Sequence, residues 1–270
     1  MQKHMIHKTT DCSGISIVIL VKVPSRHFLR ALQSARQCSN DVVVVVDGAP
    51  GDADRLGLSP TPRGVSVLVK RLDGFAAQRN YGVQHAKHPW VFHLDSDEFI
   101  TRDLAQQLSE FVGTDEAQVY SVRRLTFIWN WPLKHLFVHE TCLRLHHRRL
   151  KWIGRVHERP GDASLTTVRR LSGVIEHRTV DSLAQWLRKT EAYVHVESEG
   201  LSGWKRSRWN ILWRPLYRFG KYYIVEFGFL DGYPGLVASF LGLVYEVLLY
   251  ISVWESYSAT GVEGTPCANG

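Results

Sequence analysis

Cysteine is scarce in this 270-residue sequence, and no CxxC pair occurs in it. Neither a disulfide framework nor a cysteine-type zinc module is therefore expected. We interpret the four scattered cysteines as reduced thiols of a cytosolic protein: Cys12, Cys38, Cys142 and Cys267. The first fourteen residues carry cations but no apolar stretch long enough for a signal sequence, so we expect the protein to stay inside the cell.

The common nucleotide-binding fingerprints are also missing. No GxGxxG follows the early apolar segments and no GxxxxGK[ST] occurs, which argues against a dinucleotide-dependent enzyme and a P-loop NTPase. No RNP-like, KH or helix-turn-helix pattern is present either, so nucleic acid is not the expected partner.

Charge of one sign prevails, with 33 Lys and Arg against 26 Asp and Glu, a formal charge of +7 and a pI of about 9.3. Such an excess predicts an anionic partner, and charge alone leaves phosphate esters, nucleic acid and anionic lipid open. The 44% hydrophobic and 22% charged composition is that of an ordinary globular protein. We expect a catalytic domain over residues 1–200 and a basic, aromatic and apolar helical segment over residues 201–270.

Strand and helix patterns alternate in the first half of the chain. Four nearly continuous apolar runs predict strands that are covered on both faces, which favours an α/β fold with a mostly parallel sheet flanked by helices. The runs cover residues 15–23, 41–48, 65–71 and 90–94, and helical spacing covers residues 27–37 and 75–87. Further on, strands are predicted over 118–129 and 142–150, and a helix capped by Asp181 or Ser182 over 181–199.

An acidic cluster follows the fourth of these runs directly. Asp95, Asp97 and Glu98 crowd into four positions, and Asp47 ends another strand. Ligands of parallel sheets bind beyond the carboxyl ends of the strands, and two hard oxygen donors there suit Mg²⁺ or Mn²⁺ bound to phosphate. A metal ion is therefore the expected positive partner of the cluster. The alternative is that Asp97 or Ser96 only caps a helix beginning near Ile100.

Five segments in this order resemble family 2 glycosyltransferases, and more narrowly the lipopolysaccharide-core β-1,4-glucosyltransferase group. They are "DVVVVVDG", "GFAAQRN", "HLDSDE", "RVHE" and "GFLDGYPGL", and together they span most of the chain. The resemblance implies a GT-A fold, a nucleoside-diphosphate-sugar donor and inversion at the anomeric carbon.

The resemblance also implies roles for individual residues on the donor side. Asp47 matches the acidic residue that contacts the nucleotide base, and Arg79 and Asn80 match a pair near the nucleotide. Asp95 matches a carboxylate on the ribose or metal side, and Ser96 beside it is assigned to the nucleotide site. "VKVPSR" and "GAPGD" depart from the family pattern near the nucleotide, so base and sugar stay open, with a UDP-hexose favoured.

On the reaction side, Asp97 matches the metal ligand and Glu158 takes the place of the general base. A divalent ion on Asp97 stabilises the leaving diphosphate, and Glu158 removes the proton of the incoming hydroxyl. Without the resemblance, "RVHER" with His157 is better explained as an exposed, ion-paired strand. His177 is either a further metal ligand or a structural histidine.

The last part of the chain combines cations and aromatic residues between Trp204 and Tyr223, followed by an apolar run over Gly235–Trp254. Interleaved cations and aromatics are typical of a membrane interface with anionic lipid. Glu246 lies within the apolar run, which favours a helix in or on the membrane over a clean span. We expect a peripheral or monotopic enzyme at the cytoplasmic face of the inner membrane, acting on a lipid-linked saccharide such as a lipopolysaccharide core.

Other classes stay open at this point. The apolar run could instead pack on the catalytic domain or on another subunit. The carboxylates could serve a metal-dependent nucleotidyltransferase or phosphate-ester hydrolase. The basic and aromatic residues could also stack on single-stranded nucleic acid, although such a binding protein would leave Asp47, Asp95 and Asp97 unexplained.

Overall fold

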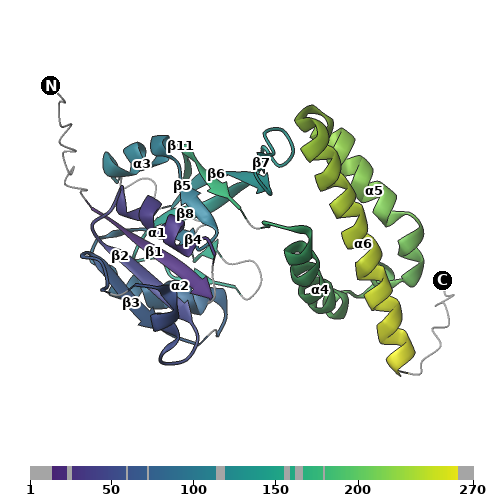
Figure 1. Cartoon of the computed structure of the whole chain (residues 1–270), viewed down its shortest axis with the longest axis horizontal. Helices are drawn as coiled ribbons and strands as arrows, with labels where there is room; N and C mark the ends of the chain where they lie inside the picture. Colours follow the sequence, from purple (N-terminus) through teal and green to yellow (C-terminus); the bar gives the residue numbers. More distant parts are fainter. Residues whose placement is uncertain are drawn as a thin grey trace. The chain divides into compact units, whose positions relative to one another are not determined.

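A computed structural model describes most of the chain, and its elements are labelled in Figure 1. The described residues are 14–22, 26–58, 60–71, 73–113, 119–154, 159–161, 167–178 and 180–260. The chain divides into two compact units. The first comprises Met1–Leu125 with His139–His177, and the second Thr126–Val138 with Arg178–Gly270.

Four parallel strands form one half of the central sheet, in the order β3-β2-β1-β4. They are β1 (Ile15–Lys22), β2 (Val42–Asp47), β3 (Val65–Val69) and β4 (Trp90–Asp95). β-branched side chains dominate β1 and β2, and almost all of these residues are buried. The parallel sheet expected from the uniformly apolar runs is therefore confirmed in this half.

Two helices cover opposite faces of these strands. Ile17 and Ile19 share a core cluster with residues of α1 (Phe28–Arg36), whereas Val18 and Leu20 share another with Val83 of α2 (Phe75–His85). Because successive side chains of a strand point to opposite faces, the run of apolar residues from Ile17 to Val21 in β1 requires that both faces are covered.

The other half of the sheet continues the order with β4-β8-β6-β11-β5 and is antiparallel in the pairs β4·β8, β6·β8 and β5·β11. These strands are β5 (Glu98–Ile100), β6 (Val119–Ile128), β8 (Thr141–His147) and β11 (Val168–His177). The sheet is thus mixed, and mostly parallel only in its first half. The twelve residues between β6 and β8 contain β7, which pairs antiparallel with β6, and no helix of the kind that usually joins parallel strands.

Smaller elements complete the first unit: η1 (Asp52–Leu56), α3 (Arg102–Ser109) and the two-stranded pair β9 (Trp152–Ile153) and β10 (Arg159–Pro160). Of the four cysteines, Cys38 and Cys142 form no disulfide within the described residues, and Cys12 and Cys267 lie outside them.

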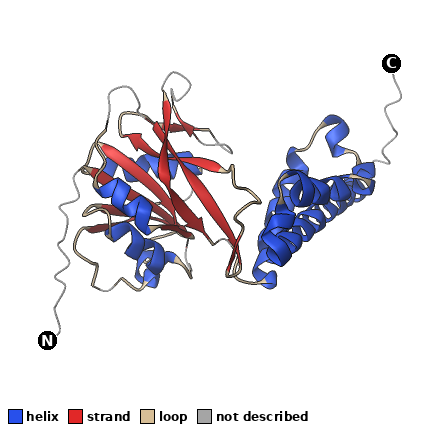
Figure 2. Ribbon diagram, turned by 90° about the horizontal axis from the view of Figure 1, so that it is seen from above, coloured by secondary structure: helices blue, strands red, loops and turns tan. Residues whose placement is uncertain are grey.

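The second unit is helical, as the blue ribbons in Figure 2 show. It contains β7 (Trp131–Pro132), α4 (Leu183–Gly200), α5 (Arg214–Gly220), a π-helical turn η4 (Lys221–Val225) and α6 (Gly232–Thr260). Three short 3-10 turns are η2 (Gly203–Arg206), η3 (Arg208–Leu212) and η5 (Gly228–Asp231). Ser182 caps α4 by accepting a hydrogen bond from the backbone N–H of Gln185, as one of the two expected caps.

This division differs from the expected boundary at residue 200. Helix α4 belongs to the second unit because Val194 packs in one cluster with Leu249, Tyr250 and Val253 of α6. The expected extent of the catalytic domain, residues 1–200, stays a prediction about function.

The apolar helix α6 contains an acidic residue, Glu246, whose negative charge is neutralised by two arginines. Glu246 is 1% exposed and accepts hydrogen bonds from Arg214 (3.3 Å) and from Nε of Arg218 (2.8 Å), both on α5. Residues Tyr233–Tyr257 are long and apolar enough to cross a bilayer by length and composition alone, a test that core helices of soluble proteins also pass.

Candidate active site

The carboxyl ends of two parallel strands bring Asp47 and Asp95 to the same edge of the sheet. β1 lies between them, with Lys22 opposite Asp47 and Leu20 opposite Asp95. Both aspartates are partly exposed there. The edge is where a ligand of a parallel sheet is expected to bind.

Arginines are positive partners of Asp95 and Glu98 in the acidic cluster. Asp95 accepts one hydrogen bond from Arg79 (Nη2–Oδ1 3.2 Å) and one from Arg144 (Nη2–Oδ2 2.7 Å). Arg144 also donates to the fully buried Glu98, and Arg124 lies 3.9 Å from the same carboxylate. Arginines thus neutralise Asp95 and Glu98 within the fold, and the expected metal ligation by Asp95 stays a prediction.

The two carboxylates differ in their pKa. Burial by itself raises the pKa of Asp95, but Arg144 and Arg79 outweigh it and hold that pKa far below its ordinary value. Burial raises the pKa of Glu98 to about 7, against the attraction of Arg144 and with a further contribution from Asp95. Asp95 is thus anionic at neutral pH. Glu98, in contrast, is partly protonated at that pH.

Asp97 lies in the turn between β4 and β5 and does not cap a helix. The next helix, α3, is capped by Thr101, whose Oγ1 accepts from the backbone N–H of Leu104, so the capping alternative for Asp97 or Ser96 is wrong. His177, at the end of β11, places Nε2 3.8 Å from Oδ2 of Asp97. Ser96 occupies the same turn and is partly exposed.

His177 is a neutral imidazole in this setting. Burial lowers its pKa to about 4, although Asp97 acts in the opposite direction. Its Nδ1 is buried and has no hydrogen-bond partner among the described residues. In those residues no group of three or more His, Cys, Asp or Glu side chains could by itself hold a metal ion.

Arg79 projects from α2 with only part of its guanidinium engaged. Nη2 bonds Asp95, while Nε and Nη1 are buried and have no partner within the described part of the chain. The guanidinium carbon lies 4.9 Å from the ring centroid of Trp152, a cation–π contact that fixes the plane of the group.

Asn80 uses both ends of its amide on the backbone of Trp152. Nδ2 donates to the carbonyl oxygen of Trp152 (2.8 Å), and Oδ1 accepts from its N–H (2.8 Å). The amide of Asn80 thus attaches β9 to α2, and its expected contact with the nucleotide stays a prediction.

A buried histidine pair lies behind the acidic cluster, and no local sequence signal indicated it. Nε2 of His93 and Nε2 of His146 are 2.9 Å apart, and the indole N–H of Trp152 is 3.0 Å from each. Nδ1 of His146 is 2.9 Å from the carbonyl oxygen of His147, so in the neutral ring this nitrogen carries the proton. Nε2 of His146 is then an acceptor and His93 the donor. Burial lowers the pKa of His146 to about 4 and that of His93 far below 6.5.

The expected general base cannot be placed in this geometry. Glu158, with His157, lies outside the described residues. The chain on either side of it is held together, because Ile153 of β9 pairs with Arg159 of β10. The role of Glu158 stays a prediction.

Comparison with known proteins identifies the family. Residues 16–167, more than half of the chain, match the model of glycosyl transferase family 2. An uncharacterized glycosyltransferase of Rickettsia prowazekii is 21% identical over 243 residues, covering 84% of this chain and 82% of its own. The lipopolysaccharide core biosynthesis glycosyltransferase LpsC of Rhizobium meliloti is 21% identical, covering 85% and 87%.

Among solved structures, TarS of S. aureus in complex with UDP-GlcNAc is similar over 92% of both chains, at 13% identity and a TM-score of 0.48. The family match covers the strands β1 to β10 and the acidic cluster of the site, and ends just before β11, whose last residue is His177. The chain belongs to glycosyl transferase family 2, with a GT-A fold, and the protein is a glycosyltransferase.

Proposed function

We propose that this enzyme transfers a hexose, with inversion, from a nucleoside-diphosphate sugar to a hydroxyl of a lipid-linked saccharide such as a lipopolysaccharide core. A UDP-hexose is the favoured donor. The observation that carries the donor site is the approach of Asp97 and His177, from two distant segments, to 3.8 Å near the carboxyl edge of the parallel strands. Nε and Nη1 of Arg79, beside Asp95, have no hydrogen-bond acceptor among the described residues. Buried N–H groups of this kind favour a ligand that supplies acceptor oxygens.

Asp97 and His177 fit a divalent cation in part. A carboxylate oxygen and a neutral imidazole nitrogen are ligands that Mn²⁺ accepts, and Mg²⁺ binds through carboxylates and phosphates. Asp97 would hold the ion with His177, and oxygens of the donor diphosphate would complete its shell. When bound, the ion supplies Lewis-acid stabilisation of the charge on the leaving diphosphate.

Asp95 then has a different role from the expected one. Its oxygens accept from Arg79 and Arg144, and Arg144 reaches Glu98 on the other side of the turn. One guanidinium thus fastens both ends of the turn that carries Ser96 and Asp97. We assign Asp95 and Glu98 to positioning Asp97, and Asp47 and Ser96 keep their proposed contacts with the nucleotide.

The transfer itself breaks the bond between the anomeric carbon and the diphosphate oxygen and forms one to the acceptor oxygen from the opposite side. The acceptor proton passes to a carboxylate, for which we propose Glu158. A positioned general base contributes about 10²–10⁴-fold to such a step.

The second unit supports a membrane-bound acceptor. Sixteen of the 26 exposed large apolar side chains in the described chain lie between Trp204 and Trp254. Large exposed apolar areas mark interaction surfaces, and clustered cations beside them favour anionic lipid. The relative LpsC, a glycosyltransferase of lipopolysaccharide core biosynthesis, adds the lipopolysaccharide core as acceptor class. We propose the cytoplasmic face of the inner membrane as the place of action.

Calorimetric titration tests the donor site with UDP, GDP and their sugars, in Mn²⁺ and after EDTA. The expected result is metal-dependent binding of a uridine nucleotide, and absence of any nucleotide binding would overturn the proposal. Product analysis with and without a lipid-linked acceptor separates the alternatives. A hydrolase or nucleotidyltransferase would consume or exchange the nucleotide without an acceptor.

A further inference from the structure

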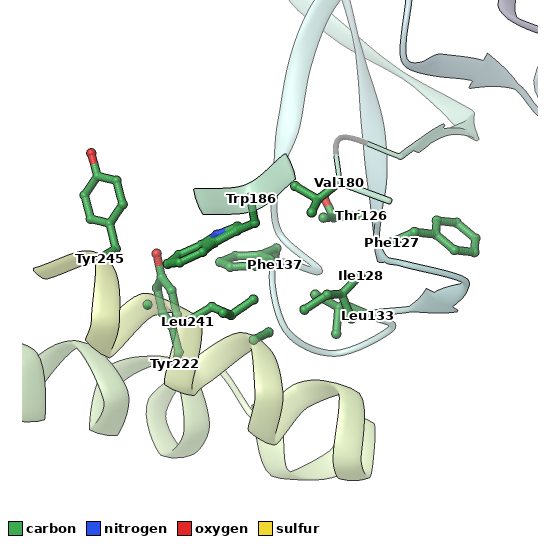
Figure 3. A pocket seen from close by; sticks show the side chains of 12 residues that line it. Thr126, Phe127, Ile128, Leu133, Phe137, Val180, Trp186, Tyr222, Leu241 and Tyr245 are labelled. Atoms are coloured by element: carbon green, nitrogen blue, oxygen red, sulfur yellow. The ribbon is translucent and has the colours of Figure 1, made fainter. Parts of the chain in front are cut away.

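The second unit contains an apolar pocket of about 220 Å³ with aromatic walls. Figure 3 shows Phe137, Trp186, Tyr222 and Leu241 around the pocket. Ile128 and Leu133 also line it, and they belong to the hairpin of β6 and β7 with the residues that follow β7 up to Val138. An apolar cavity of about 150 Å³ already admits benzene, so this pocket has room for a longer hydrocarbon group.

Two of the polar groups in its wall already have partners. The hydroxyl of Tyr222 accepts a hydrogen bond from Nη1 of Arg218 (3.1 Å), and the hydroxyl of Tyr245 donates to Glu197. A sugar ring needs several hydrogen-bond partners in its site, and this wall offers few that are free. The chemistry of the lining therefore favours a hydrocarbon chain.

The wall formed by the hairpin is held in place firmly. Phe137 has a left-handed backbone (φ 65°), a conformation that costs a bulky residue about 1–3 kcal/mol. The segment before it is fixed by Asp231, whose carboxylate accepts from the backbone N–H groups of Lys134 (2.8 Å), His135 (3.1 Å) and Leu136 (2.8 Å). This anchoring keeps Phe137 in the wall, so the pocket is preformed.

The charge and the exposed apolar residues near the pocket indicate which kind of molecule supplies the hydrocarbon chain. Residues 201–225, which include the lining residue Tyr222, contain six cations and no acidic residue. Next to the lining residues Leu241 and Tyr245, Phe240 and Val244 are 50% and 37% exposed. An anionic headgroup and an apolar chain in one molecule match these two features.

We propose that this pocket holds one acyl chain of an anionic bilayer lipid, withdrawn from the membrane on which the second unit lies. The inference rests on the membrane part of the proposed function and is independent of the donor and of the transfer reaction.

Monomeric 12-carbon lysophosphatidylglycerol, below its micelle-forming concentration, is the probe. Native mass spectrometry and calorimetry of the full chain are expected to give one bound molecule. Ala238→Phe, which fills the pocket, should weaken binding at least tenfold. Ala184→Phe, at an exposed position of α4 outside the lining, is the matched control and should leave it unchanged.

Val180→Phe, at another lining residue, replaces Ala238→Phe if that variant fails to fold, and circular dichroism verifies folding. Equal binding by the pocket variants and the control, or no binding by the wild type, would overturn the inference. Flotation with anionic vesicles measures membrane association separately. A protein that floats but takes up no lysolipid refutes the pocket alone, whereas loss of UDP binding concerns only the donor site.

Discussion

Replacing Asn80 tests whether this residue attaches β9 or contacts the nucleotide. Its amide makes two 2.8 Å hydrogen bonds to the backbone of Trp152. Each such bond contributes about 0.5–1.5 kcal/mol, so Asn80→Ala should lower the free energy of unfolding by ~1–3 kcal/mol. Asn80→Asp should cost at least as much, because a carboxylate oxygen would then face the carbonyl oxygen of Trp152.

Thermal unfolding measures this effect, and about 2–4 °C of melting temperature is expected per kcal/mol for a chain of this size. Gln106→Ala is the matched control, because Gln106 makes one exposed amide–carboxylate bond to Glu110 and should change stability by less than ~0.5 kcal/mol. UDP affinity should change little in either variant. An unchanged melting temperature together with a tenfold loss of UDP affinity in Asn80→Ala would return Asn80 to the nucleotide site.

Four further outcomes are expected. Asp97→Asn should weaken Mn²⁺-dependent UDP binding tenfold or more in calorimetry without lowering the melting temperature, since an amide is a poorer cation ligand than a carboxylate; retained binding would remove Asp97 from the metal site. Glu158→Gln should keep donor binding and depress turnover ~10²-fold or more, and an equal loss of donor affinity would contradict its role as base. His146, whose pKa is about 4 in the fold, takes up its proton more readily when unfolded. Its contribution to stability is therefore complete above pH 6.5 and falls by roughly 1.4 kcal/mol per unit as the pH drops toward 4, so urea unfolding from pH 7 to 5 should have a smaller pH slope in His146→Leu than in the wild type. Replacing Lys205, Arg206 and Arg208 together by Ala should weaken flotation with anionic vesicles by about 1 kcal/mol per cation, with little effect on neutral vesicles, and an insensitive flotation would exclude this surface.

Much of the fold follows from short stretches of sequence. The β-branched runs of β1 and β2 admit little but strands covered on both faces, and the ends of β2 and β4 place Asp47 and Asp95 at one edge. Ser182 caps α4 and the helix ends at Gly200, as local preferences predict. These features depend on neighbours a few residues away, so the order of the residues is enough to predict them.

The partners of the acidic cluster depend on the tertiary structure. Arg144 reaches Asp95 because β8 pairs with β4, and His177 reaches Asp97 because β11 pairs with β5, across 49 and 80 positions of sequence. The same holds for Glu246, whose cost in an apolar helix depends on Arg214 and Arg218 of another helix. A carboxylate in the sequence indicates that a positive partner is needed. Which cation meets that need depends on which strands and helices become neighbours, and that is decided by burial of the apolar faces of the whole chain.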